Sequence, residues 1–200
     1  MKKLFILAFA ATFAVGSACA QQPMQRPNDS VAHPHHQHDG QHHGQHRGPH
    51  HGGHHGQKPP MEVPPTQYNA DGIDMAVVDF FPAVKNLKQE GKWTGVYDAT
   101  GQLLGYVVYS KPASDGIKGF NGETPVMIAF DVKKKIAGVC LLPNVETPGF
   151  AQRVKDAGLY SQWNGLSVKK ARKKQVDTVS GATFTSRAVV QSVQAVLATL

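Results

Sequence analysis

Cysteine is scarce in this chain of 200 residues, which contains two, Cys19 and Cys140. Cys19 lies in an N-terminal stretch that we expect to be processed during export. Cys140 lies in an apolar run, where a cysteine is expected to behave as a small buried hydrophobic residue and not as a redox thiol. A disulfide scaffold is therefore excluded, and the fold has to rest on its hydrophobic core.

Long hydrophobic runs are also missing, since spanning a bilayer takes ~20 apolar residues. The longest run, Leu4 to Val15, follows Met1-Lys2-Lys3 and precedes Ala18-Cys19-Ala20. A charged start, an apolar stretch and small residues are typical of a secretory signal peptide. We therefore expect residues 1–20 to be a signal peptide and the protein to be exported to the periplasm or cell envelope. Cleavage after Ala20 is favoured, and a lipoprotein modified on the cysteine is the alternative.

Histidine is absent after residue 55, because all eleven histidines lie between His33 and His55. Residues 21–67 are rich in Gln, Pro and Gly, and they contain too few large apolar side chains to offset the entropy of ordering. We expect a disordered tether there, followed by a folded domain over residues 68–200. The histidines show no spacing typical of a metal site, so weak metal binding by this tract is a secondary interpretation.

Positive charge is concentrated in the second half of the chain. Residues 91–200 hold fourteen Lys and Arg against seven Asp and Glu, whereas residues 1–90 hold seven of each. Aromatic residues are not interleaved with the basic ones, so no nucleic-acid partner is indicated. The run from Lys169 to Lys174 is either a solvated face or a docking patch for an acidic redox partner or anionic lipid. No Gly-x-Gly-x-x-Gly opens a helix, so no nicotinamide site is indicated.

The pattern of residues 68–200 predicts an α+β domain of antiparallel hairpins, short helices and a C-terminal amphipathic helix. Asp74 is expected to cap a short helix that ends near Pro82. Two hairpins are expected, with strands at 93–97 and 103–109 and at 125–132 and 136–142. Short helices are expected within residues 150–175, and apolar residues at helical spacing predict the closing helix over residues 186–200.

The stretch from Asp177 to Arg187 is the candidate functional site. It has the pattern of a strand end, a small-residue turn and a helix start, so Thr183 or Thr185 is expected to cap the helix. That interpretation needs no ligand. The unpaired N–H groups and the helix dipole at such a start also suit an anion. Gly181 leaves room for a bulky group beside the backbone, and Arg187 could add a contact to a phosphate.

This stretch resembles the flavinylation motif of the FMN-binding domain family. The family includes the flavin-carrying subunits of the sodium-translocating NADH:quinone reductase and of the related ferredoxin-driven ion-pumping complex. The motif is Asp, two variable residues, Ser or Thr, Gly-Ala, Thr or Ser, one variable residue and the acceptor Thr, and the chain matches every fixed position from Asp177 to Thr185. The resemblance implies that a separate flavin transferase, using FAD and magnesium, joins the FMN phosphate to Thr185 as a phosphodiester. The other cofactor-binding residues that it implies here are Ser180, Gly181, Ala182, Thr183 and Arg187.

A second family motif is Glu146-Thr147-Pro148-Gly149, which follows an apolar strand. Pro148-Gly149 is expected to form a tight turn that exposes backbone polar groups, and Thr147 adds a hydroxyl. The resemblance implies that this turn contacts the isoalloxazine ring. Family members usually continue with Leu-Gly, whereas this chain has Phe150-Ala151, a departure that bears on packing at the ring. Residues 119–122 loosely resemble the family's Gly-aromatic-Gly-Gly turn.

The resemblance spans roughly residues 90–200 and implies an electron carrier or redox subunit, not a stand-alone enzyme. The flavin would supply the redox chemistry, and no catalytic residue is expected in turnover. The implied partners are the flavin transferase and redox donor and acceptor proteins, with membrane-bound ones among the candidates. The alternative is a metal-binding or haem-handling envelope protein that uses the tract from His33 to His55. Reversible flavin storage is a third interpretation.

Overall fold

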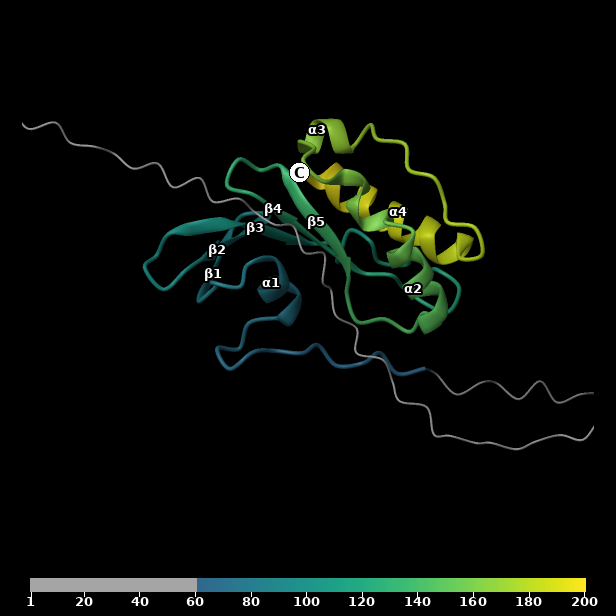
Figure 1. Cartoon of the computed structure of the whole chain (residues 1–200), viewed down its shortest axis with the longest axis horizontal. Helices are drawn as coiled ribbons and strands as arrows, with labels where there is room; N and C mark the ends of the chain where they lie inside the picture. The colour runs from purple at the N-terminus through teal and green to yellow at the C-terminus, as the bar shows by residue number, and fades with distance from the viewer. Residues whose placement is uncertain (1–60) are drawn as a thin grey trace, which may run out of the picture. The chain divides into compact units, whose positions relative to one another are not determined.

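The computed structural model describes residues 61–200, and a five-stranded antiparallel sheet forms its centre (Figure 1). Each strand pairs with its neighbour in the chain, so the order across the sheet is β1-β2-β3-β4-β5. The strands are β1 (Asn86–Glu90), β2 (Trp93–Tyr97), β3 (Leu103–Tyr109), β4 (Val126–Phe130) and β5 (Ile136–Leu141). The predictions for residues 1–60, which concern the signal peptide, Cys19, the histidine tract and most of the tether, lie outside the described residues.

Helices cover both faces of this sheet, with α1 on one face and the others on the opposite face (Figure 1). They are α1 (Met75–Phe80), α2 (Pro148–Asp156), the 3₁₀ helix η1 (Leu159–Trp163), α3 (Val168–Ala171) and α4 (Thr183–Thr199). Antiparallel strands with helices that do not alternate with them confirm the predicted α+β class. Within residues 61–200, no helix is both long and apolar enough to cross a membrane.

The sequence predicted most of these elements. Both hairpins are confirmed as β2–β3 and β4–β5, and Asp74 caps α1, because its Oδ1 accepts from the Ala76 N–H at 2.9 Å. The closing helix is confirmed but starts at Thr183, three residues before the predicted start at 186. Strand β1 was missed. All five of its residues are exposed, so no apolar alternation marks it.

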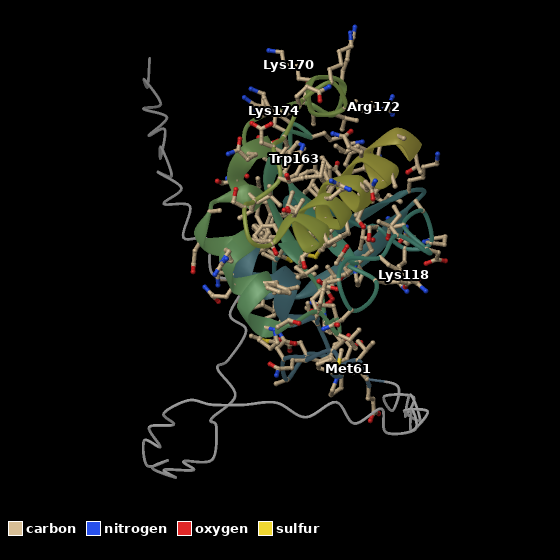
Figure 2. The ribbon with its side chains drawn as sticks, turned by 90° about the vertical axis from the view of Figure 1, so that its right-hand side faces the viewer. Met61, Lys118, Trp163, Lys170, Arg172 and Lys174 are labelled. Atoms are coloured by element: carbon tan, nitrogen blue, oxygen red, sulfur yellow. The ribbon has the colours of Figure 1, made fainter. Side chains whose placement is uncertain are left out.

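Strand β4 shows how the sheet divides the core. All five of its residues are buried. Val126, Ile128 and Phe130 pack against α2, η1 and α4, while Met127 and Ala129 face α1. Since alternate side chains point to opposite faces of a strand, one strand contributes to two separate apolar clusters. The larger cluster includes Trp163 of η1, which is completely buried inside the helical layer (Figure 2).

Helix α4 carries the candidate site at one end and is anchored at the other. Its 17 residues make it about 25 Å long at ~1.5 Å per residue. Arg172, just after α3, donates from Nε to the Leu197 carbonyl oxygen at 2.7 Å and so holds the C-terminal end. Lys170 and Lys174 point outward near this end (Figure 2). The basic run and Thr185 therefore lie at opposite ends of α4.

The two sides of the sheet end differently. Beyond β5, the Ile136 N–H donates to the Leu166 carbonyl at 2.9 Å, and the Gly165 N–H donates to the Ile136 carbonyl at 2.8 Å. Lys135 also bridges to Ser167, so a short segment covers the start of β5. At the other side, β1 is the outermost strand of the described sheet.

Replacing Phe130 by alanine should destabilise the domain strongly, because its ring is fully buried and packs edge-on against Trp93 at 4.8 Å between centroids. We expect a loss of about 3–5 kcal/mol in the free energy of unfolding, measured by urea denaturation. Val132→Ala, at a position that is 51% exposed, is the control and should change it by less than about 0.5 kcal/mol. A loss below ~1 kcal/mol for Phe130→Ala would contradict this description of the core.

Candidate functional site

The turn before α4 differs from the predicted cap. Ala182 is the N-cap residue and no side chain caps the helix, so the expectation that Thr183 or Thr185 caps it is wrong. The reason is that the helix begins before either threonine could cap it, since the Ser186 N–H donates to the Ala182 carbonyl at 2.9 Å. The Ser186 hydroxyl instead stabilises the turn, because its Oγ accepts from the Val179 N–H at 2.9 Å. The first-turn N–H groups of α4 are thus left without a capping side chain, as an anion site requires.

Gly181 lets a positive charge lie directly on this turn. Its φ of +74° is in the left-handed region that favours glycine. A Cβ at this position would overlap the guanidinium of Arg153 from α2. Within residues 61–200, Arg153 forms no ion pair with a carboxylate, so its charge is available to a ligand.

Arg153 is a residue that the sequence prediction did not include. The predicted phosphate contact was Arg187, which is exposed in the second turn of α4. Arg153 lies on another helix, and nothing in its local sequence marks it. Arg153 comes to lie beside Gly181 only when α2 and α4 pack together in the folded domain.

Glu146 organises the opposite wall of the site. It follows β5 and is buried, with 5% of its surface exposed. Its carboxylate accepts the backbone N–H groups of Phe120 at 3.1 Å, Asn121 at 2.7 Å and Gly122 at 3.0 Å. Gly119 completes this turn, because a Cβ there would lie 2.8 Å from the carboxylate. The turn of residues 119–122 therefore wraps around a carboxylate of the same chain.

Thr185 completes the contact between the two sequence motifs. It lies in the first turn of α4, is fully buried, and donates its hydroxyl hydrogen to Oε2 of Glu146. The two residues are 39 positions apart in the sequence. The carboxylate thus lies between the 119–122 turn and the hydroxyl that the family resemblance implies as the FMN acceptor.

The hydrogen bonds to Glu146 determine its protonation. Burial alone would raise the pKa of its carboxyl, because it disfavours the charged form. The Thr185 hydroxyl and the backbone N–H groups of Asn121, Gly122 and Phe120 outweigh this effect and hold the pKa below its usual value. Glu146 is therefore a carboxylate at neutral pH.

The rest of the second motif begins a helix. Thr147 is the N-cap of α2 and Pro148 occupies its first turn, so the expected separate tight turn at Pro148-Gly149 is wrong. Proline suits a first helical position, because its φ is already helical and its missing N–H would have no helical partner. The Thr147 hydroxyl accepts from Nδ2 of Asn121 at 2.9 Å, which is a second link between this motif and the 119–122 turn.

Three phenylalanines belong to the elements that form the site, namely Phe120 in the 119–122 turn, Phe150 in α2 and Phe184 in the first turn of α4. Phe120 and Phe150 pack edge to face with ring centroids 5.2 Å apart. Phe120 is 57% exposed and Phe184 is 64% exposed. Phe150 is the residue that replaces the usual leucine of the family, and its packing against Phe120 gives that departure a structural role. Exposed rings beside an anion site offer an apolar surface to a planar ligand.

A cavity of about 720 Å³ has a lining that includes Asn144 and Val145, next to Glu146 in the chain. Its lining includes Val63, Tyr68, Tyr109, Lys111 and Glu123. It does not include Thr185, Glu146 or Arg153. No group of His, Cys, Asp and Glu within residues 61–200 has the arrangement of a metal site.

Residues 119–198 match the model of a protein family described as the FMN-binding domain. This segment contains both motifs and the parts that form the site, namely the 119–122 turn, Glu146 and the start of α4. The predicted family resemblance is confirmed over these residues.

Two curated proteins are similar to the chain over part of their length. One is a subunit of the ion-translocating oxidoreductase complex of Shewanella piezotolerans, which is 32% identical over 41% of this chain and 43% of that protein. The other is a subunit of the Na(+)-translocating ferredoxin:NAD(+) oxidoreductase complex of Acetobacterium woodii, which is 28% identical over 48% of each. The chain thus spans about half the length of these relatives or slightly less.

A solved structure, the crystal structure of Shewanella oneidensis NqrC, is also similar. It is 23% identical, with a TM-score of 0.35 over 64% of this chain and 70% of that chain.

Glu146→Gln should weaken the acid dependence of stability. A carboxyl whose native pKa is lowered contributes stability that is present above its unfolded pKa and is lost as the pH falls through the native pKa. Urea unfolding followed downward from neutral pH should therefore show wild type losing stability more steeply than Glu146→Gln below about pH 4.5, the ordinary pKa of the group. Glu62→Gln, at an exposed position outside the site, should retain the wild-type slope. Equal slopes for wild type and Glu146→Gln would contradict the assigned ionisation.

Proposed function

Because residues 119–198 of this chain belong to the FMN-binding domain family, we propose that the protein carries FMN covalently on Thr185 and transfers electrons. The observation that carries this proposal is the meeting of the two motifs at one point, where the Thr185 hydroxyl contacts Glu146 at the start of α4. FMN, when bound, supplies the redox chemistry, and the chain positions it.

The residues present fit the phosphate end of FMN. A phosphodiester on Thr185 keeps one negative charge, and the N-terminal end of α4 favours negative charge through its N–H groups and dipole. The Arg153 guanidinium on Gly181 adds a positive charge beside the same turn. Gly181 fits this arrangement because it has no Cβ, which would overlap the guanidinium.

The ring end of FMN fits the phenylalanines near the site. Phe120, Phe150 and Phe184 supply apolar surface, and the linked side chains of Asn121 and Thr147 supply polar atoms at its edge. A flavin ring has the same mixture, with apolar faces and a polar edge. These side chains would orient the ring and exclude part of the water from it.

The partners of the protein follow from this role. A flavin transferase has to attach FMN, and an electron donor and an acceptor have to contact the ring. The two curated relatives are subunits of oxidoreductase complexes, which supports redox proteins as partners. The N-terminal sequence supports export, so we place these partners in the periplasm or cell envelope. The protein is then a carrier within an electron-transfer chain, not a stand-alone enzyme.

Thr185→Ala should abolish covalent flavin, because it removes the attacking oxygen. Wild type and variant would be expressed together with a flavin transferase and compared by intact mass and by colour after denaturation. Wild type should gain the mass of one FMN group, and Thr185→Ala should gain none. Thr183→Ala, two positions earlier in the same turn, is the control and should still be modified, with a lower yield at most.

Two outcomes would contradict the proposal. One is full modification of Thr185→Ala, which would place the flavin elsewhere. The other is a colourless wild type that retains metal, which would favour the metal-binding interpretation of the tract from His33 to His55.

The two arginines of the site should differ in effect. Arg153→Gln should slow flavinylation, because it removes the charge beside Gly181, whereas Arg187→Gln should leave the rate near wild type. A charge-assisted hydrogen bond of about 1.5–3 kcal/mol corresponds to a change of roughly 10–150-fold. The measurement is the rate of mass gain with limiting transferase. A larger effect for Arg187→Gln than for Arg153→Gln would assign the phosphate contact to Arg187.

A further inference from the structure

The hydroxyl of Thr185 already has a proton acceptor in the unmodified protein. We propose that Glu146 is a catalytic residue of the attachment reaction and accepts the Thr185 proton as the hydroxyl oxygen attacks phosphorus. This inference rests on the proposed function, and it adds a role for a carboxylate of the protein that is being modified.

The balance of the step is simple. A bond forms between Oγ1 of Thr185 and the phosphorus of the FMN half of FAD, which the transferase supplies together with magnesium. The bond from that phosphorus to the oxygen of the AMP phosphate breaks, and AMP leaves with the electron pair. The hydroxyl proton moves to Glu146, and nothing is oxidised or reduced.

Glu146 is the residue placed to take the proton of the Thr185 hydroxyl. The hydroxyl of Thr185 donates to Oε2 of Glu146, and both side chains are buried away from bulk water. Arg153, whose guanidinium lies on Gly181 in this turn, cannot take the proton, because a guanidinium stays protonated in proteins. Within residues 61–200, the Thr185 hydroxyl makes no other side-chain hydrogen bond.

The 119–122 turn connects access to Thr185 with the basicity of Glu146. Thr185 has no exposed surface, so a transferase reaches its oxygen only after part of the site moves. The turn is held by three N–H groups on Glu146 and by the Asn121–Thr147 side-chain bond. If the turn moves away, Glu146 loses those three donors, and its affinity for a proton rises. The same movement of the turn thus exposes Thr185 and makes Glu146 more basic.

The product also favours a protonated Glu146. An ester oxygen has no hydrogen, so modified Thr185 can no longer donate to the carboxylate. A phosphodiester would then lie beside a negatively charged Glu146, which costs free energy in a buried site. A proton kept on Glu146 removes this repulsion and lets the carboxyl group donate a hydrogen bond to the phosphodiester.

The test is the rate of flavinylation of unmodified full-length protein by a purified flavin transferase with FAD and Mg²⁺, followed by intact mass. Glu146→Gln retains a side-chain oxygen for the N–H groups of the 119–122 turn but cannot take the proton. We expect its rate to fall by about 10²–10⁴-fold, the usual contribution of a general base. Glu62→Gln, which removes an exposed carboxylate outside the site, is the matched control. It keeps Glu146, so its rate should equal that of wild type.

Chemical rescue keeps the test decisive if Glu146→Gln folds poorly. Formate should restore part of the rate of Glu146→Ala, whereas chloride at the same ionic strength should not, because only formate accepts a proton. A folded Glu146→Gln protein within about threefold of the wild-type rate would overturn the inference, since a general base contributes far more. Failure of wild type to gain any FMN would instead contradict the proposed function, so the two failures are distinguishable.

Discussion

A buried carboxylate is the constraint on which the site depends. A charged group away from water is costly unless hydrogen bonds satisfy its oxygens. Glu146 meets this requirement with donors from two distant segments, the 119–122 turn and the start of α4. Both segments are thereby positioned relative to β5, which leads into Glu146. The sheet and the helical layer hold the two segments where their donors reach Glu146.

Features with a local signal could be predicted from the sequence. Asp74 capped a helix because its side chain reaches a nearby N–H, and β4 stood out because every residue in it is apolar. The two motifs pointed to one site through their resemblance to a family. Strand β1 gave no such signal, because its exposed side chains do not alternate and it depends on pairing with β2. The sequence also predicted a tight turn at Pro148 and Gly149, whereas these residues form the first turn of α2.

Contacts between distant elements were not predictable in this way. Arg153 reaches Gly181 only after α2 and α4 have packed side by side, and the buried state of Thr185 depends on the same packing. Gly119 and Gly181 have the same role on the two sides of the site, because each leaves space for a charged group of another residue. At each position a charged group lies where a Cβ would be, a carboxylate at Gly119 and a guanidinium at Gly181. The sequence shows two glycines, whereas the structure shows two charged groups in contact with the backbone.

The unequal sides of the sheet bear on self-association. An outer strand presents unpaired backbone groups that can recruit a strand from another molecule. On the β5 side, residues 165–167 already occupy part of those groups. On the β1 side, the strand is short and carries Lys88 and Glu90, and charged residues on a short edge strand discourage edge-to-edge pairing with another molecule. Both edges of the described sheet therefore carry features that oppose its extension by a strand from a second molecule.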